Sequence, residues 1–129
     1  MTTPLKKIML VEDEEDIRVI AKFSLEKLGN FTVRYCSSGK EALTAVEDFA
    51  PDLILLDMMM PEMDGVMTLQ ALRNTSSKPI PIIFMTAKVQ PKEIEHYKSL
   101  GALDVIPKPF NPKELPNTLN QIWSAYQNG

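Results

Sequence analysis

The chain of 129 residues has the length of one ordinary domain, and its content of 44% hydrophobic and 24% charged residues is typical of a water-soluble globular protein. The formal net charge of −3 excludes a strongly basic surface for nucleic acid, and no apolar run is long enough to cross a bilayer. The single cysteine, Cys36, excludes an internal disulfide, so we expect it to be a small core residue of a cytoplasmic protein.

Five short apolar runs predict five β-strands. They are KIMLV (7–11), FTVRYC (31–36), DLILL (52–56), PIIFM (81–85) and LDVI (103–106). The runs are uniformly apolar, so each strand is expected to be covered on both faces.

A helix is predicted after each strand. The first carries apolar and small residues at helical spacing, namely Ile17, Ile20, Ala21, Ser24, Leu25 and Leu28. The second opens with Ser38 and Glu41, which have the spacing of a capping box, and the third begins near Gly65. The fourth begins with Pro91 and ends at Gly101.

The fifth helix is predicted to start at Asn111 as its cap, with Pro112 and Glu114 in the first turn. Its expected core stripe is Leu115, Leu119, Ile122 and Tyr126. Pro116 lacks the N–H that the second turn of this helix requires, so an irregular start is expected.

The alternation of strand and helix predicts an α/β fold with a doubly wound open parallel sheet and five helices, as one domain over residues 1–129. In such sheets the ligand site lies beyond the carboxyl ends of the strands. The residues that follow each apolar run are therefore the candidates for function.

Polar groups follow four of the five strands at this edge. They are Glu12 and Asp13, then Asp57, then Thr86 with Ala87, and finally Lys108 before Pro109. Gathered carboxylates repel one another by about 1 to 4 kcal/mol per pair at about 4 Å. A hard cation relieves this repulsion, and magnesium takes one or two protein carboxylates while keeping positions for phosphate oxygens. A metal, a lysine, a hydroxyl and a carboxylate acceptor are together the parts of a site for a phosphoryl group.

Several neighbouring residues have a simpler structural explanation. Glu14, Glu15 and Asp16 fit the first turn of a helix, where acids are favoured, and Asp64-Gly65 is a turn signal. The methionines at 58, 59, 60 and 63 are expected to pack, because no cysteine or histidine accompanies them, and His96 is expected to be solvated.

Four motifs, LVED, DMMMPEMDG, MTA and KPF, resemble in order and spacing the receiver domain of two-component response regulators. The resemblance spans nearly the whole chain and implies a flavodoxin-like fold with strand order 2-1-3-4-5. It implies that Asp57 accepts a phosphoryl group from a histidine kinase or histidine phosphotransfer protein. It also implies that Glu12, Asp13, Asp57 and the backbone carbonyl of Met59 hold Mg²⁺, while Lys108, Thr86 and the N–H of Ala87 contact the phosphoryl group.

The chain departs from the family pattern at Val105, where the family usually carries an aromatic residue that is coupled to the threonine. Met59 and Lys88 occupy the two positions that flank the route of the hydrolytic water in the family. We expect no enzyme in the ordinary sense, no output domain, no direct nucleic-acid partner and a monomer or weak dimer. A downstream protein is expected to bind the fourth helix, fifth strand and fifth helix.

Two other classes stay open. One is a phosphorylation-independent interaction module with the same fold, which would usually lack the acidic pair or the lysine. The other is a flavin-binding electron carrier, although VEDEED would repel a phosphate where such a carrier needs a cradle. A terminal regulator and a relay intermediate use the same site and are not distinguished.

Overall fold

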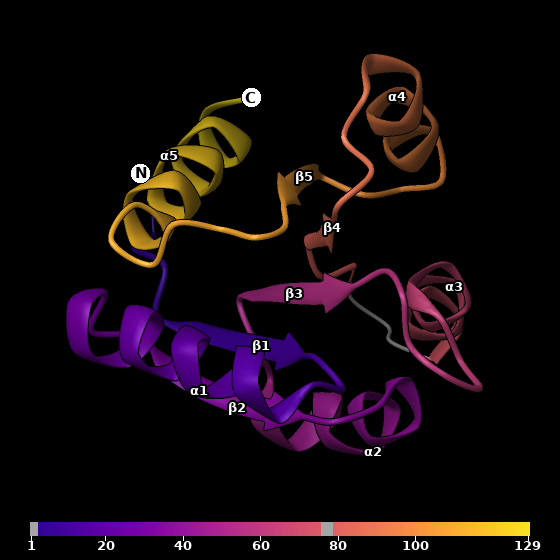
Figure 1. Cartoon of the computed structure of the whole chain (residues 1–129), viewed down its shortest axis with the longest axis horizontal. Coiled ribbons are helices and arrows are strands. Elements are labelled where there is room, and N and C mark those ends of the chain that lie inside the picture. Colours follow the sequence, from indigo (N-terminus) through magenta and orange to yellow (C-terminus); the bar gives the residue numbers. More distant parts are fainter. Residues whose placement is uncertain (1–2, 76–78) are drawn as a thin grey trace.

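The computed structural model describes residues 3–75 and 79–129 and contains one five-stranded parallel sheet between two layers of helices (Figure 1). The strands are β1 (Lys7–Val11), β2 (Thr32–Cys36), β3 (Leu53–Asp57), β4 (Ile82–Thr86) and β5 (Asp104–Pro107). Their order in the sheet is β2-β1-β3-β4-β5, which confirms the predicted doubly wound fold.

The helices alternate with the strands along the chain. They are α1 (Glu15–Lys22) with its continuation η1 (Phe23–Leu28), α2 (Gly39–Phe49), α3 (Gly65–Thr75), α4 (Pro91–Ser99) and α5 (Leu115–Asn128). α1, η1 and α5 contribute to the core on one face of the sheet, and α2, α3 and α4 to the core on the other. No helix within the described residues has the length and apolarity needed to span a bilayer.

The prediction that all strands are covered on both faces is right for the inner strands and wrong for the edges. β3 and β4 are buried at every residue, whereas Thr32 and Arg34 of β2 are exposed. β2 is an edge strand whose Val33 and Tyr35 pack against the core on one face, while Thr32 and Arg34 on the other face are exposed.

The first helix departs from regular α-helical geometry in its second half. The segment Phe23–Leu28 is π-helical, and the N–H of Gly29 donates to the carbonyl of Ser24 at 3.0 Å, five residues back. Ala21, Ser24 and Leu25 of the predicted stripe are buried, but Ile20 and Leu28 are exposed.

The fifth helix begins at Leu115 rather than at Asn111, which corrects the predicted cap. The side chain of Asn111 instead accepts the N–H of Lys113 at 2.9 Å in the preceding turn. Pro116 therefore lies in the first helical turn, where its missing N–H costs nothing. The predicted core stripe included Tyr126, but Tyr126 is exposed and Trp123 is buried instead.

Only one of the two hydrogen bonds of the predicted capping box of α2 is formed. The Ser38 hydroxyl accepts the Glu41 N–H at 3.1 Å, but the Glu41 carboxylate accepts from Ser37 rather than Ser38. Each such cap stabilises a helix by about 1 kcal/mol.

Candidate functional site

The carboxyl ends of β1 and β3 bring three acidic side chains together. β1 pairs with β3 up to Val11 and Leu56, so Glu12 and Asp57 follow neighbouring, in-register positions. One carboxylate oxygen from each of Glu12, Asp13 and Asp57 lies within 4.8 Å of the others. The sheet therefore assembles the acidic cluster that the sequence predicts.

Two of these carboxylates are buried. Glu12 is 0% and Asp57 2% exposed, whereas Asp13 is half-buried. Unpaired carboxylates are costly to remove from water, so the cluster needs positive charge.

Among the described residues, Lys108 is the one basic side chain that forms ion pairs with this cluster. Its ammonium Nζ lies 2.9 Å from Glu12 Oε1 and 3.2 Å from Asp57 Oδ1. Its backbone N–H donates to the Thr86 carbonyl at 2.9 Å, which anchors the residue after β5 to the end of β4. The predicted lysine thus reaches both β1 and β3.

The charges of Glu12 and Lys108 respond to this crowding. Burial, with a smaller contribution from the neighbouring Asp57, raises the pKa of the Glu12 carboxyl to about 7 against the opposing hydrogen bond from Lys108. Burial alone lowers the pKa of Lys108, but the ion pairs with Glu12 and Asp57 outweigh it and the pKa is raised. One ammonium therefore remains charged and only partly neutralises three carboxylates.

Asp13 carries the observation that points to a cation. Its Oδ1 atom is buried and has no hydrogen-bond partner in the part of the chain that the structure describes. A buried carboxylate oxygen without a donor has a large desolvation cost, which a metal ion would remove. The all-oxygen donor set of Glu12, Asp13 and Asp57 suits magnesium rather than a soft metal.

Thr86 ends β4 beside Asp57, because Asp57 pairs with Met85 in the sheet. Its side chain is buried, and its Oγ1 accepts the Lys88 N–H at 3.1 Å. Ala87 follows in the exposed loop. The Thr86 hydroxyl therefore lies at the same edge of the sheet as Asp57.

Met59 lies in the loop after Asp57 and is 71% exposed, unlike the buried Met58 and Met60. Its N–H lies 3.4 Å from Asp57 Oδ1, which is a long contact. Its carbonyl as a metal ligand stays a prediction.

The loop folds back at Gly65, whose N–H donates to the Met58 carbonyl at 2.9 Å. A Cβ at Gly65 would lie 2.8 Å from the Met58 Cα and 2.9 Å from the Asp57 carbonyl oxygen. Glycine is required here because the start of α3 touches the backbone that carries Asp57.

Two further contacts at Glu12 are not predicted from the sequence. The Glu14 N–H donates to Glu12 Oε2 at 3.2 Å, and the Arg18 guanidinium donates to the Glu12 carbonyl at 2.7 Å. Arg18 stands one turn after Glu14, so helical spacing was the available signal. Both contacts orient the acidic end of β1.

Comparison with known proteins identifies the family and supports the fold. The model of the response regulator receiver domain family matches residues 8–120. The chain belongs to this family, whose members are signalling domains of two-component systems. It is 40% identical over 110 residues to the alkaline phosphatase synthesis transcriptional regulatory protein PhoP of Bacillus subtilis, which covers 85% of this chain and 45% of PhoP. It is 38% identical over 128 residues to the transcriptional regulatory protein CpxR of Escherichia coli, covering 95% of this chain and 53% of CpxR. The chain thus spans about half the length of these relatives.

Solved structures share the whole architecture. The chemotaxis response regulator CheY4 of Vibrio cholerae superimposes with a TM-score of 0.82 at 32% identity, over 92% of this chain and 98% of CheY4. The receiver domain of the Francisella response regulator 1452 superimposes with a TM-score of 0.81 at 27% identity, over 96% of this chain and 99% of that one.

Proposed function

We propose that this receiver domain accepts a phosphoryl group on Asp57 from a phosphohistidine of a kinase or phosphotransfer protein. The observation that carries the proposal is the buried Asp57 carboxylate, which lies 3.2 Å from the Lys108 ammonium and in one cluster with Glu12 and Asp13. Among the described residues, Asp13 Oδ1 has no hydrogen-bond partner. A carboxylate in this setting is a nucleophile with positive charge available for the phosphoryl oxygens.

In the transfer, an oxygen of Asp57 forms a bond to phosphorus while the bond from phosphorus to the histidine nitrogen breaks. The histidine keeps the electron pair and takes a proton. Lys108 moves its interaction from the Asp57 carboxylate to the phosphoryl oxygens. Reset is hydrolysis of the acyl phosphate, which returns Asp57 and releases inorganic phosphate.

Magnesium is the cofactor that fits the site, and Glu12, Asp13, Asp57 and the Met59 carbonyl would hold it. When bound, it supplies positive charge to the phosphoryl oxygens. The Glu14 N–H and the Arg18 guanidinium hold Glu12 at the end of β1, which keeps its carboxylate in the acidic cluster.

The response to phosphorylation is proposed to be a change of the face built from α4, β5 and α5, to which a downstream protein binds. Thr86 would turn toward the phosphoryl group, with the Ala87 N–H as a further donor. Val105 lies on β5 opposite Phe84, and Phe84 packs edge to face against Tyr97 of α4 at 5.6 Å. The aromatic contact between sheet and α4 thus comes from Tyr97 rather than from position 105.

Direct nucleic-acid binding is not proposed for the described residues, whose formal charge balance is acidic. The relatives PhoP and CpxR are named as transcriptional regulators, and each is about twice as long as this chain. Those names apply to the relatives, and we assign no DNA-binding role to this chain from them.

Intact mass after incubation with acetyl phosphate, with and without magnesium, tests the proposal. We expect one phosphoryl adduct in wild type with magnesium, almost none with a chelator, and none in Asp57→Asn. Asp48→Asn, an exposed aspartate on α2, is the matched control and should be labelled like wild type. Failure of labelling with acetyl phosphate and with phosphorylated kinases would favour the alternative, an interaction module that works without phosphorylation.

A further inference from the structure

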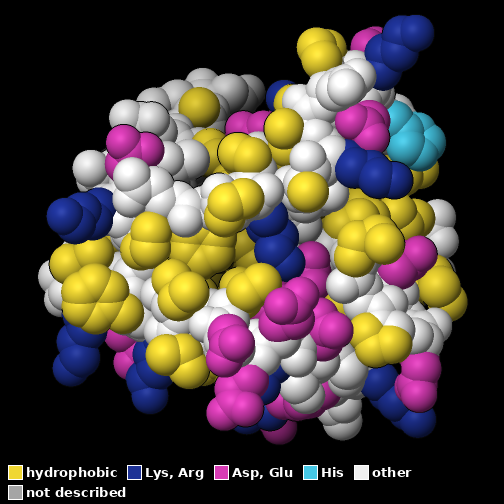
Figure 2. Space-filling model, viewed as in Figure 1, with side chains coloured by type: hydrophobic (Ala, Val, Ile, Leu, Met, Phe, Trp, Pro, Cys, Tyr) yellow, Lys and Arg dark blue, Asp and Glu magenta, His cyan; other side chains and the backbone are white. Residues whose placement is uncertain are grey.

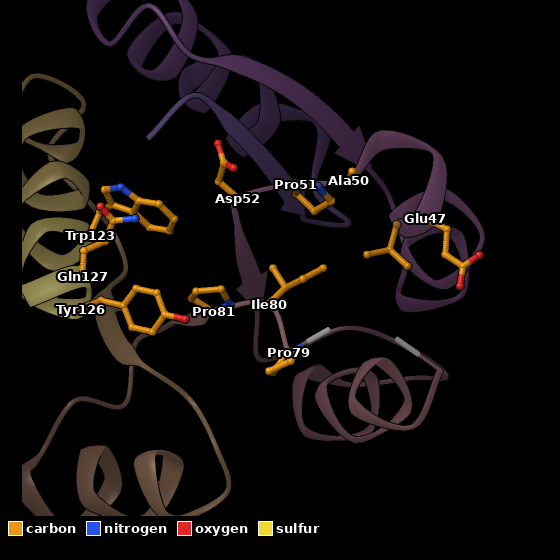
Figure 3. Close-up of a pocket in the computed structure, with 11 residues that line it drawn as sticks. Glu47, Ala50, Pro51, Asp52, Pro79, Ile80, Pro81, Trp123, Tyr126 and Gln127 are labelled. Atoms are coloured by element: carbon orange, nitrogen blue, oxygen red, sulfur yellow. The ribbon is translucent and has the colours of Figure 1, made fainter. Parts of the chain in front are cut away.

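A second concave surface lies at the opposite end of the sheet from Asp57. It has a volume of about 660 Å³, within the usual range for ligand sites. We call it the Trp123 groove. Its walls come from the α2–β3 connection, the residues before β4 and the last turns of α5 (Figure 3). None of the residues assigned to phosphoryl transfer lines it.

The groove combines aromatic and proline rings with negative charge. Trp123 and Tyr126 line one wall, with ring centroids 5.7 Å apart and planes tilted by 39°. Pro51, Pro79 and Pro81 line the loops opposite. Trp123 is anchored, because its indole N–H donates to the Thr3 carbonyl at 2.6 Å.

The charge of the lining residues has one sign. Glu47 and Asp52 are acidic, and none of the described residues that line the groove is a lysine or an arginine. Asp52 is held in place, since its Oδ2 accepts the N–H groups of Lys6 at 3.0 Å and Lys7 at 2.9 Å. Charge complementarity therefore selects a cationic partner, and aromatic faces add attraction for a cation.

We propose that the Trp123 groove binds an extended, proline-containing peptide segment with a basic residue. Such segments dock between aromatic and proline rings and need no backbone pairing. Addition of a β-strand is excluded here, because β3 and β4, which begin at the groove, have partners on both sides.

The chain contains a single tryptophan, so the fluorescence of Trp123 and the NMR signal of its indole N–H report on the groove alone. The probes are acetyl-Pro-Pro-Arg-Pro-Pro-amide and two analogues, one with Glu in place of Arg and one with Ala in place of every Pro. We expect a saturable change with the first peptide, and at least roughly fivefold weaker binding of both analogues.

Tyr126→Ala should weaken binding roughly fivefold, and Glu47→Gln roughly threefold, while Phe23→Ala should leave it unchanged. Phe23 is a matched control because it is an exposed aromatic residue on η1, remote from the groove. Circular dichroism confirms that each variant is folded.

Three outcomes would overturn the proposal. They are no saturable change up to about 2 mM peptide, equal binding of the Glu analogue, and a change in the Trp123 signal with protein concentration alone, which would mean that a second copy fills the groove. The result is independent of phosphoryl transfer, because Asp57→Asn leaves the groove intact and should bind the peptide like wild type.

Discussion

The negative charges of the acidic side chains at the ends of β1 and β3 are only partly compensated by basic side chains of the described residues. Lys108 compensates Glu12 and Asp57 at 2.9 Å and 3.2 Å, but the buried oxygen of Asp13 has no donor within the described residues. Figure 2 shows a group of acidic side chains next to a basic one near the middle of this view. The acidic cluster therefore keeps electrostatic repulsion that a bound cation would relieve.

Asp13→Asn should relieve this repulsion in metal-free protein and raise the free energy of unfolding by about 1 kcal/mol. In wild type, magnesium at about ten times its Kd should add about 1.4 kcal/mol, and Asp13→Asn should lose most of that gain. Urea denaturation with and without magnesium, at matched ionic strength, measures both effects.

The control for this prediction is Glu95→Gln, an exposed acid on α4. It should respond to magnesium like wild type. A magnesium gain in Asp13→Asn as large as that of wild type would remove Asp13 from the metal site.

At the scale of elements, the loop between β3 and α3 joins the site to the scaffold. The Gly65 N–H closes the loop on the Met58 carbonyl at 2.9 Å, while Met58 and Met60 pack into the core. The Asp64 side chain accepts the Met67 N–H at 2.9 Å and caps α3. Asp57 is thus positioned both by its strand and by the start of the next helix.

Gly65→Ala should destabilise the domain by about 2 kcal/mol, because the added Cβ would lie 2.8 Å from the Met58 Cα and the backbone must move. Labelling by acetyl phosphate should slow as well, since Asp57 shares that backbone. Urea denaturation and intact mass measure these effects. Gly129→Ala, at the last residue of the chain, is the control and should change neither.

At the scale of the whole molecule, the sheet separates two surfaces with different chemistry. The acidic site lies at the carboxyl ends of the strands, and the Trp123 groove lies at their amino ends.

The π-helical segment η1 is hydrogen-bonded to the connection before α5 and to β2. The Ser24 hydroxyl donates to the Pro112 carbonyl at 2.6 Å, and the Tyr35 hydroxyl of β2 donates to the Glu26 carboxylate.

The Tyr35 contact makes stability depend on pH in alkali. Burial, and then the hydrogen bond to Glu26, raise the pKa of Tyr35 in the folded state. The phenol of the unfolded chain ionises near pH 10, so the unfolded state binds fewer protons above that pH. The contribution of Tyr35 to the free energy of unfolding is fully present below about pH 10 and is lost as the pH rises above that value. The loss is at most about 1.4 kcal/mol per pH unit, and it is smaller here because the ring is only half-buried.

Tyr35→Phe should therefore show a shallower fall of the free energy of unfolding between about pH 9 and pH 11 than wild type. Tyr126→Phe, which changes an exposed tyrosine, should keep the wild-type slope. The free energy of unfolding is measured by urea denaturation at each pH. Equal slopes in wild type and Tyr35→Phe would show that Tyr35 is not the source of this pH dependence.

The alternation of apolar strands with amphipathic helices was sufficient to predict the parallel sheet, its helices and the edge at which Glu12, Asp57, Thr86 and Lys108 meet. These features depend on local periodicity and on the rule that parallel strands end at one edge, both of which can be read along the chain. Tertiary structure alone decided the start of α5, the π-helical turn, the exposure of β2 and the partners of Lys108. It also decided that Trp123 and Tyr126 meet loops about 45 to 75 residues away to form a groove. Such features depend on which distant side chains pack together, and no single stretch of sequence encodes that.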